Sequence, residues 1–270
     1  MASLRQFLLW LQVPPEEVTP RAITQYIDVL MARGLTPKTI NCHLERVRQF
    51  YHYLIQEEEL KLLNPVKKGY SLRMPKPLPR HMTEEQLQVL FTAVKTPRDR
   101  AMFMLMLRCG LRVEEVAGLT LGAIEPARRR LLVHHAKWRK ARVVYLSDDA
   151  LRALGDYLRG RPESTTQKVF LVEKGTYRGQ PLSIRGIQKR MEYYAKKTGL
   201  KISCHHLRHT MATQMLNADA ELVTIQDLLG HRWITTTQRY CRVSNLKVQR
   251  DYYKAMEKVM QRTTYNQLFT

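Results

Sequence analysis

Two stretches in the second half of the chain decide its interpretation: HHLRHTMAT at residues 205–213 and LLGHRWITTTQRY at residues 228–240. In the first, His205 and Arg208 are three residues apart, so they share one face of a helix. In the second, Tyr240 follows a glycine–histidine pair by nine residues. Arginine binds phosphate oxygens bidentately, and an ionised tyrosine is a nucleophile. Taken alone, each stretch is a weak signal, because a single tyrosine is more often a half-buried packing residue than a nucleophile.

The chain is strongly basic. Its 270 residues include 45 Lys and Arg against 24 Asp and Glu, a formal net charge of +21. A charge of this size repels itself unless a polyanion partner offsets it. Nucleic acid is the leading partner, because neutralised phosphates release their counterions; an anionic membrane surface is the weaker alternative. The 44% of hydrophobic residues excludes a disordered chain, and the length favours one or two domains.

Several other classes of protein are excluded by simple patterns. The four cysteines form no CxxC pair, which favours reduced thiols and a cytoplasmic protein, nucleoid-associated if prokaryotic. No apolar run is long enough to span a membrane. His205 and His209 have the i,i+4 spacing of a zinc site, but no glutamate lies between them and no cysteine pair completes the set. We therefore expect no metal and no cofactor.

Residues 1–62 predict a small helical domain. Thr19-Pro20 and Thr36-Pro37 each combine an N-cap with a proline at the first helical position. In the second of these helices, apolar residues recur at three- and four-residue spacing. This stripe consists of Ile40, Leu44, Val47, Phe50 and Leu54.

Residues 61–82 have a different composition, with four prolines, six basic residues and no acid. Such a stretch cannot form a long helix or a core. We therefore expect an extended basic linker over 63–82, followed by a second domain over 83–270.

The second domain is predicted to be mainly helical with a small antiparallel β-sheet. Thr83 caps a helix, and AMFMLMLRCG at 101–110 is apolar nearly all round, as in a buried helix that ends at a glycine. Two β-rich segments flank a basic turn within 129–147, which indicates a hairpin or small sheet. A further apolar stripe predicts a helix within 248–260.

Four clusters carry the candidate chemistry: residues 110–115, 136–140, 205–209, and 229–231 followed by Tyr240. Their set and order resemble the tyrosine recombinase (phage integrase) family. The resemblance covers residues 83–245 and extends weakly to TPKTINCHLERVRQFYHYL, which looks like the helical core-binding domain of that family. It implies a core-binding domain joined to an α+β catalytic domain. The implied catalytic residues are Arg112, Lys137, His205, Arg208, His231 and Tyr240, with Glu115 in support.

The resemblance also implies a role for each side chain. Arg112 and Arg208 would bind the scissile phosphate, and Tyr240 would attack it to form a 3′-phosphotyrosyl bond. Lys137 would protonate the leaving 5′-oxygen, although Arg139 and Lys140 are close enough in sequence to compete for this role. His205 is the candidate base for the tyrosine, and His231 would donate a hydrogen bond to the phosphate. Glu115 would orient His205 or Arg112, the alternative being an ordinary carboxylate at a helix start. His209 is expected to support the fold.

The implied function is site-specific DNA recombination through a Holliday junction, in integration, excision or resolution. Its partners would be double-stranded DNA with a specific target site and three further copies of the chain, with accessory proteins as a further class; without DNA the chain would be monomeric or weakly associated. The alternatives are a type IB topoisomerase-like enzyme and a non-catalytic DNA-binding relative. Candidate DNA-binding residues are Lys38, Arg46, Arg48, Lys67, Lys68, Arg73, Lys76, Arg80, Trp138, Arg139 and Lys140; for the first three, a solvated helix face is the alternative.

Overall fold

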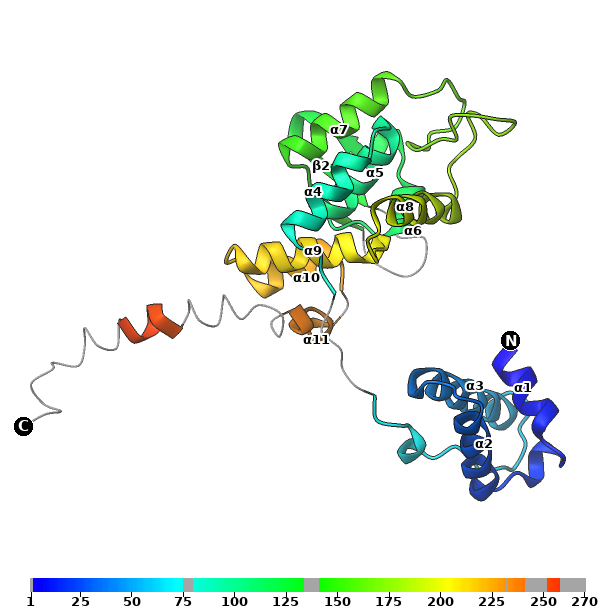
Figure 1. Cartoon of the computed structure of the whole chain (residues 1–270). Coiled ribbons are helices and arrows are strands. Elements are labelled where there is room, and N and C mark those ends of the chain that lie inside the picture. Colours follow the sequence, from blue (N-terminus) through cyan, green and yellow to red (C-terminus); the bar gives the residue numbers. More distant parts are fainter. Residues whose placement is uncertain (1, 75–79, 134–140, 232, 241–251, 258–270) are drawn as a thin grey trace, which may run out of the picture. The chain divides into compact units, whose positions relative to one another are not determined.

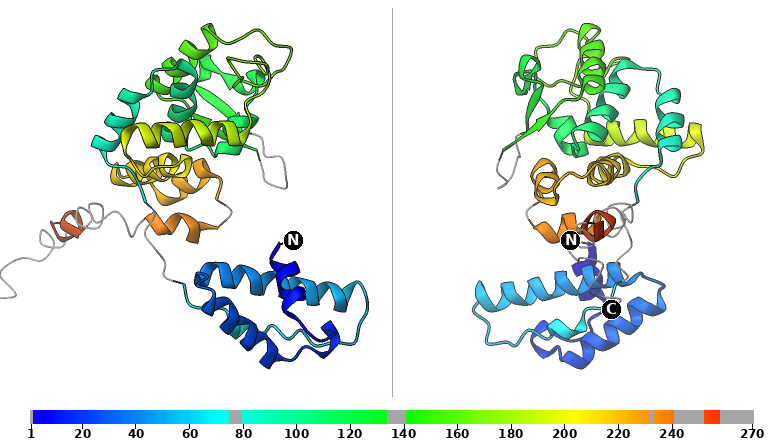
Figure 2. Two further views of the ribbon diagram at one scale, coloured as in Figure 1. Left: turned by 45° about the vertical axis from the view of Figure 1, so that its right-hand side comes forward. Right: turned by 90° about the vertical axis from the view of Figure 1, so that its left-hand side faces the viewer.

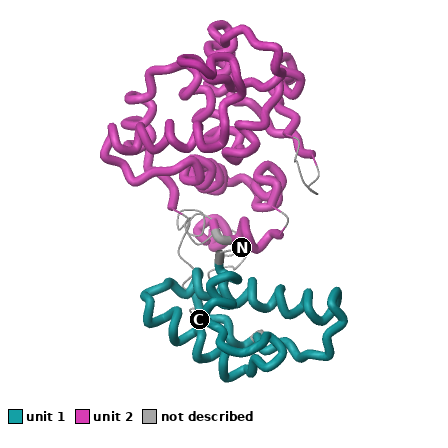
Figure 3. Tube along the Cα trace, turned by 90° about the vertical axis from the view of Figure 1, so that its right-hand side faces the viewer, with its two compact units in different colours: residues 1–77 teal, residues 78–270 magenta. Residues whose placement is uncertain are grey.

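The structure is a computed structural model that describes residues 2–74, 80–133, 141–231, 233–240 and 252–257. The chain divides into two compact units, residues 1–77 and 78–270 (Figure 3). Among the described residues, no helix combines the length and apolar character needed to cross a membrane.

The first unit is helical, as predicted. It contains α1 (Ala2–Trp10), α2 (Pro20–Ala32) and α3 (Pro37–Gln56), with short 3₁₀ turns at Pro15–Glu17 and Lys68–Tyr70 (Figure 1). Both predicted N-caps are confirmed: the Thr19 hydroxyl accepts from the amide of Ala22, and that of Thr36 from the amide of Thr39. The buried core comprises Phe7, Val18, Ile23, Tyr26, Ile27, Leu30, Ile40, Leu44, Val47, Tyr51 and Val66.

The first part of the expected linker packs on this helical unit. Val66 is buried in its core, and the side chain of Asn41 pairs with the backbone of Leu72 through two hydrogen bonds of 2.8 and 2.9 Å. Arg48 donates to the carbonyl oxygens of Val66 and Lys67. The composition predicted an extended basic linker here, but apolar side chains between the charged ones pack the start of the segment on the helical unit.

The second unit is mainly helical, with a small sheet at its edge (Figure 2). The sheet consists of β1 (Ile124–Glu125), β2 (Arg130–Val133) and β3 (Arg142–Tyr145), all antiparallel in the order β1-β2-β3. The mixed fold class is therefore confirmed. The helices are α4 (Glu84–Ala93), α5 (Pro97–Arg108), α6 (Val113–Gly118), α7 (Asp148–Arg159), α8 (Ile184–Thr198), α9 (Cys204–Asn217), α10 (Leu222–Leu229) and α11 (Ile234–Thr237), with 3₁₀ turns at Leu121–Ala123, Pro126–Arg128 and Gln238–Tyr240.

The predicted buried helix is α5, which lies between α7 and α9 (Figure 1). It ends at Arg108 with Cys109 as its C-cap, and Gly110 then adopts a φ of +63°, which favours glycine. A Cβ atom at Gly110 would lie 3.0 Å from Leu229 and 3.2 Å from Met211. The glycine thus lets the chain turn against α9 and α10 and start α6.

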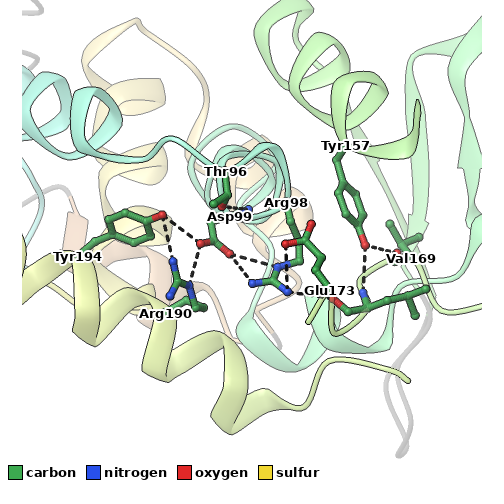
Figure 4. Close-up of polar contacts among 9 residues, drawn as sticks. Thr96, Arg98, Asp99, Tyr157, Val169, Glu173, Arg190 and Tyr194 are labelled. Carbon is green, nitrogen blue, oxygen red and sulfur yellow. Dashed lines mark hydrogen bonds and ion pairs between the residues drawn. The ribbon is translucent and has the colours of Figure 1, made fainter. Parts of the chain in front are cut away.

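A buried carboxylate fixes the start of α5 to α8 (Figure 4). Asp99 is fully buried, and one of its oxygens accepts from Arg98. Its other oxygen accepts from Nε of Arg190 at 2.8 Å and from the hydroxyl of Tyr194 at 3.1 Å. Buried charge is tolerated only when it is paired and hydrogen-bonded, as it is here.

Near the C-terminus, residues 252–257 are helical. The remainder of the predicted helix within 248–260 lies outside the described residues.

Candidate active site

Arg112 stands at the N-terminus of α6, held by the helix that it starts. Oε2 of Glu115 accepts from the backbone amide of Arg112 at 2.8 Å, and Oε1 accepts from its guanidinium at 3.0 Å. This is the glutamate half of a capping box. The expectation that Glu115 orients Arg112 is thus supported by direct contacts.

Glu115 also binds a second arginine, which sequence analysis did not select. Arg142, the first residue of β3, donates from both terminal nitrogens to the two carboxylate oxygens at 2.8 Å each. Burial alone would raise the pKa of Glu115, but the hydrogen bonds and charges of Arg142 and Arg112 outweigh it and lower the pKa to about 2. Glu115 is therefore a permanent anion between two cations.

Three arginines converge on the carboxyl end of α10. Arg142 donates to the carbonyl oxygen of Leu228 at 2.8 Å, Arg208 to that of Leu229, and Arg112 to that of Gly230 at 3.4 Å. The last carbonyls of a helix have no partner inside the helix and carry its negative dipole end. The guanidinium groups of Arg208 and Arg112 thus donate to the carbonyl oxygens of two consecutive residues. This brings them together although Arg208 comes from α9 and Arg112 from the start of α6.

Arg208 is the most buried of the candidate cations that the structure describes, with 4% of its surface exposed. Burial and the charge of Arg112 lower its pKa to about 9, still high enough for the guanidinium to keep its proton at neutral pH. Besides Leu229, it donates to the carbonyl oxygen of Gly110. Among the contacts of the described residues, three guanidinium charges gather close to the carboxylate of Glu115, and the backbone carbonyls that they also contact carry no full charge. Such a cluster favours binding of a further anion.

His231 follows directly after the loop that binds the arginines. Its Nδ1 lies 2.9 Å from the hydroxyl oxygen of Thr237. Burial and the nearby charges of Arg208 and Arg112 lower its pKa to about 3. His231 is therefore a neutral imidazole that offers hydrogen bonds without adding charge.

Tyr240 lies in the same site, in the 3₁₀ turn after α11. Only 2% of its surface is exposed, and its ring packs in a cluster with α9 and α10. One face is nearly parallel to the ring of His231, at a centroid distance of 6.5 Å. Its hydroxyl lies 2.7 Å from Nδ1 of His209. The phenol oxygen is thus at a polar position within an apolar cluster.

His205 lies one helical turn before Arg208 and His209 on α9. It is exposed and lines a surface cavity of about 250 Å³ with Val113, Arg185 and Cys204, among others. The histidine that contacts the Tyr240 hydroxyl is His209, which was expected only to support the fold. The structure thus brings together Arg112, Glu115, Arg208, His231 and Tyr240, and adds Arg142 and His209.

The remaining candidates divide by position. Lys76, Lys137, Trp138, Arg139 and Lys140 lie outside the described residues, as does the side chain of Lys68. Exposed candidates are Lys38, Arg46, Lys67, Arg73 and Arg80. Arg48 is partly buried and forms an ion pair with Glu45. Within the described part of the chain, no cluster of side chains has the composition of a metal site.

Comparison with known proteins identifies the family. The model of the phage integrase family matches residues 80–247, more than half of the chain. The chain belongs to the phage integrase family. Tyrosine recombinase XerC of Pelotomaculum thermopropionicum is 33% identical over 90% of this chain and 83% of its own. Tyrosine recombinase XerA of Pyrococcus horikoshii is 29% identical over 88% of this chain and 80% of its own.

Solved structures agree with the family on the fold. XerH recombinase bound to a palindromic difH substrate has a TM-score of 0.76 at 17% identity, covering 93% of this chain and 76% of that one. A λ integrase dimer bound to a core site has a TM-score of 0.70 at 18% identity, covering 88% and 68%. The predicted family is therefore confirmed, and with it the class of enzyme, a tyrosine-type DNA strand transferase that acts in site-specific recombination. The topoisomerase-like and non-catalytic alternatives are not favoured.

Proposed function

We propose that this phage integrase family member cleaves and rejoins DNA at a specific site through a covalent bond between Tyr240 and a 3′-phosphate. The observation that carries the proposal is the convergence of Arg112 and Arg208 on successive carbonyls next to the ring of His231, against which Tyr240 packs. A phosphodiester would meet two guanidinium groups, one neutral imidazole and one phenol at this place.

The chemistry follows from the charges. The transition state of phosphoryl transfer gathers negative charge on the non-bridging oxygens. The two guanidinium groups therefore stabilise the transition state more than the ground state. A free tyrosine with a pKa near 10 is about 0.1% ionised at pH 7, so the same cations also favour the phenolate. His231 donates a hydrogen bond to the phosphate, and Lys137 protonates the departing 5′-oxygen. The phosphotyrosyl bond conserves the energy of the ester for rejoining.

A complete reaction exchanges strands between two duplexes. A 5′-hydroxyl of one duplex attacks the phosphotyrosyl bond on the other, and a second round resolves the resulting Holliday junction. This requires four copies of the chain on two target sites. The high net positive charge and the exposed basic side chains of Lys67, Arg73 and Arg80 suit this function, because they can neutralise DNA phosphates.

The test uses DNA that traps the covalent state. A library of randomised duplexes, each with a nick that lets the short cleaved fragment diffuse away, is incubated with the protein in EDTA. Covalent complexes are recovered from denaturing gels, and the enriched duplex becomes the standard substrate. We expect a covalent band with the parent and none with Tyr240→Phe. A band that persists in this variant would overturn the proposal. As a control for the outcome, a supercoiled plasmid lacking the enriched sequence should not be relaxed.

A further inference from the structure

We propose that His209 is the base that takes the proton from Tyr240 during cleavage. This rests on the proposed role of Tyr240 as the nucleophile. The supporting observation is geometric: Nδ1 of His209 lies 2.7 Å from the phenol oxygen, within the distance required of a general base. The resemblance assigned this task to His205, which is exposed and lines a surface cavity with Val113 and Cys204, among others.

The surroundings of His209 suit a base and fix its position. It follows Arg208 on α9, so the backbone that places the phosphate-binding guanidinium also places the imidazole. Its ring is half-buried and tilted by 54° against that of Tyr240, at a centroid distance of 5.6 Å. To accept from the phenol, Nδ1 must be unprotonated, with the ring proton on Nε2.

The other described groups near the phenol are poorer bases. The ring of His231 lies nearly parallel to that of Tyr240, but burial and Arg208 lower its pKa to about 3, so it binds a proton weakly. The guanidinium groups of Arg208 and Arg112 favour the phenolate by their positive charge, but a protonated guanidinium cannot accept the proton of the phenol. Of the groups described here, His209 has both the contact and the chemistry.

The step balances in both directions. In cleavage, the O–H bond of Tyr240 breaks and an N–H bond forms on Nδ1 of His209. The phenol oxygen bonds to phosphorus, the bond from phosphorus to the 5′-oxygen breaks, and Lys137 gives its proton to that oxygen. In rejoining, the 5′-hydroxyl attacks phosphorus and gives its proton back to Lys137, the bond from Tyr240 to phosphorus breaks, and His209 returns its proton to the phenol. His209 therefore acts in both half-reactions.

The decisive variant is His209→Asn. The asparagine oxygen can take the place of Nδ1 and accept the same hydrogen bond, but it cannot hold the proton at neutral pH. We expect single-turnover cleavage of the enriched nicked duplex to slow by about 10²–10⁴-fold, the usual contribution of a general base. DNA affinity should stay within a few-fold of the parent. The matched control is His206→Asn, because His206 lies on the same helix and caps its first turn at Ser203 instead.

A modified substrate separates the base from the acid. In DNA with a 5′-bridging sulfur at the scissile bond, the leaving group needs no proton. Cleavage by Lys137→Ala should then recover, whereas His209→Asn should remain slow. Parent-like cleavage by His209→Asn on the oxygen substrate, or its recovery on the sulfur substrate, would overturn the inference. Loss of the covalent band in Tyr240→Phe would still uphold the proposed function, so the two can fail separately.

A further measurement keeps the test valid if His209→Asn is unstable. A fluorinated tyrosine incorporated at position 240 has a lower phenol pKa and depends less on a base. We therefore expect the ratio of the rates with His209 and with asparagine to shrink when the tyrosine is fluorinated. The asparagine variant enters both ratios, the one with tyrosine and the one with fluorinated tyrosine. A loss of folded protein in that variant therefore changes both ratios equally and cancels when they are compared. A ratio that does not change would overturn the role of a base.

Discussion

At the scale of single residues, Glu115 governs the arginine cluster, because it binds Arg112 and Arg142 at once. Its folded pKa of about 2 lies below the ordinary value of 4.5. The charged form therefore stabilises the fold above pH 4.5, and this contribution is lost as the pH falls toward 2. The difference amounts to about 3 kcal/mol at neutral pH, at about 1.4 kcal/mol per pKa unit.

We predict that Glu115→Gln lowers the free energy of unfolding by about 3 kcal/mol at pH 7, with a smaller difference from the parent at pH 3. Urea titrations at a series of pH values measure this. The matched control is Glu114→Gln, the exposed neighbour in the same helix, which should change stability little. A stability difference between the Glu115→Gln variant and the parent that is independent of pH would contradict the role of the charge.

The sequence indicated part of this residue-level arrangement. Arg112, Arg208, His231 and Tyr240 could be selected from their motifs, but not the partner of the phenol. His205 and His209 are one helical turn apart, and which one meets Tyr240 depends on the path of the chain after α10, which is a non-local property.

Arg142 was missed although a signal existed. Side chains two residues apart on a strand share a face, and Val144 is fully buried. An arginine on the buried face of β3 requires a buried anion as its partner, and Glu115 was the available candidate. No contact can be assigned to Lys137 in this way, because it lies outside the described residues.

At the scale of elements, the junction of α5 and α8 depends on Asp99. Replacing it with asparagine keeps the volume but leaves Arg98 and Arg190 without their shared carboxylate. We predict that Asp99→Asn lowers the free energy of unfolding by about 3 kcal/mol, as breaking a buried ion pair does. Thermal or urea unfolding measures the loss.

The control for this variant is Asp148→Asn. Asp148 pairs with Arg129 at the surface, with 66% of its side chain exposed, so its removal should cost little. Equal losses in the two variants would show that burial does not set the strength of the Asp99 pairs.

Element boundaries were predictable where the signal is local. The caps at Thr19, Thr36 and Thr83 are all present, because each depends on a hydroxyl and an amide three residues away. The linker was not predictable in the same way. Proline and lysine content describes how a segment would behave alone, whereas the burial of Val66 depends on its packing in the core that the helices of the first unit form.

At the scale of the whole molecule, Tyr240 lies against the helix that carries Arg208 in the same chain. We therefore predict that each protomer cleaves with its own tyrosine. A mixture of Tyr240→Phe and Arg208→Lys proteins, each inactive alone, should form no covalent complex on the enriched duplex. A restored band would show that the tyrosine is delivered to a neighbouring copy.

The basic surface of the first unit and the segment after it supplies a second prediction at this scale. Lys67, Arg73 and Arg80 are exposed, and each phosphate contact contributes about 0.9 to the slope of log affinity against log salt. We expect the triple glutamine variant to bind all DNA sequences more weakly and with a shallower slope. Fluorescence anisotropy over a salt series measures it, and an unchanged slope would remove these residues from the DNA interface.

Gly230 joins α10 to His231 in a left-handed conformation with a φ of +60°, and a Cβ atom there would lie 3.1 Å from the side chain of Arg142. Any other residue would strain the backbone and push against Arg142. Directed evolution toward new target sequences should therefore retain glycine at this position. Altered DNA preference would have to be sought in surface residues that do not support the arginine cluster.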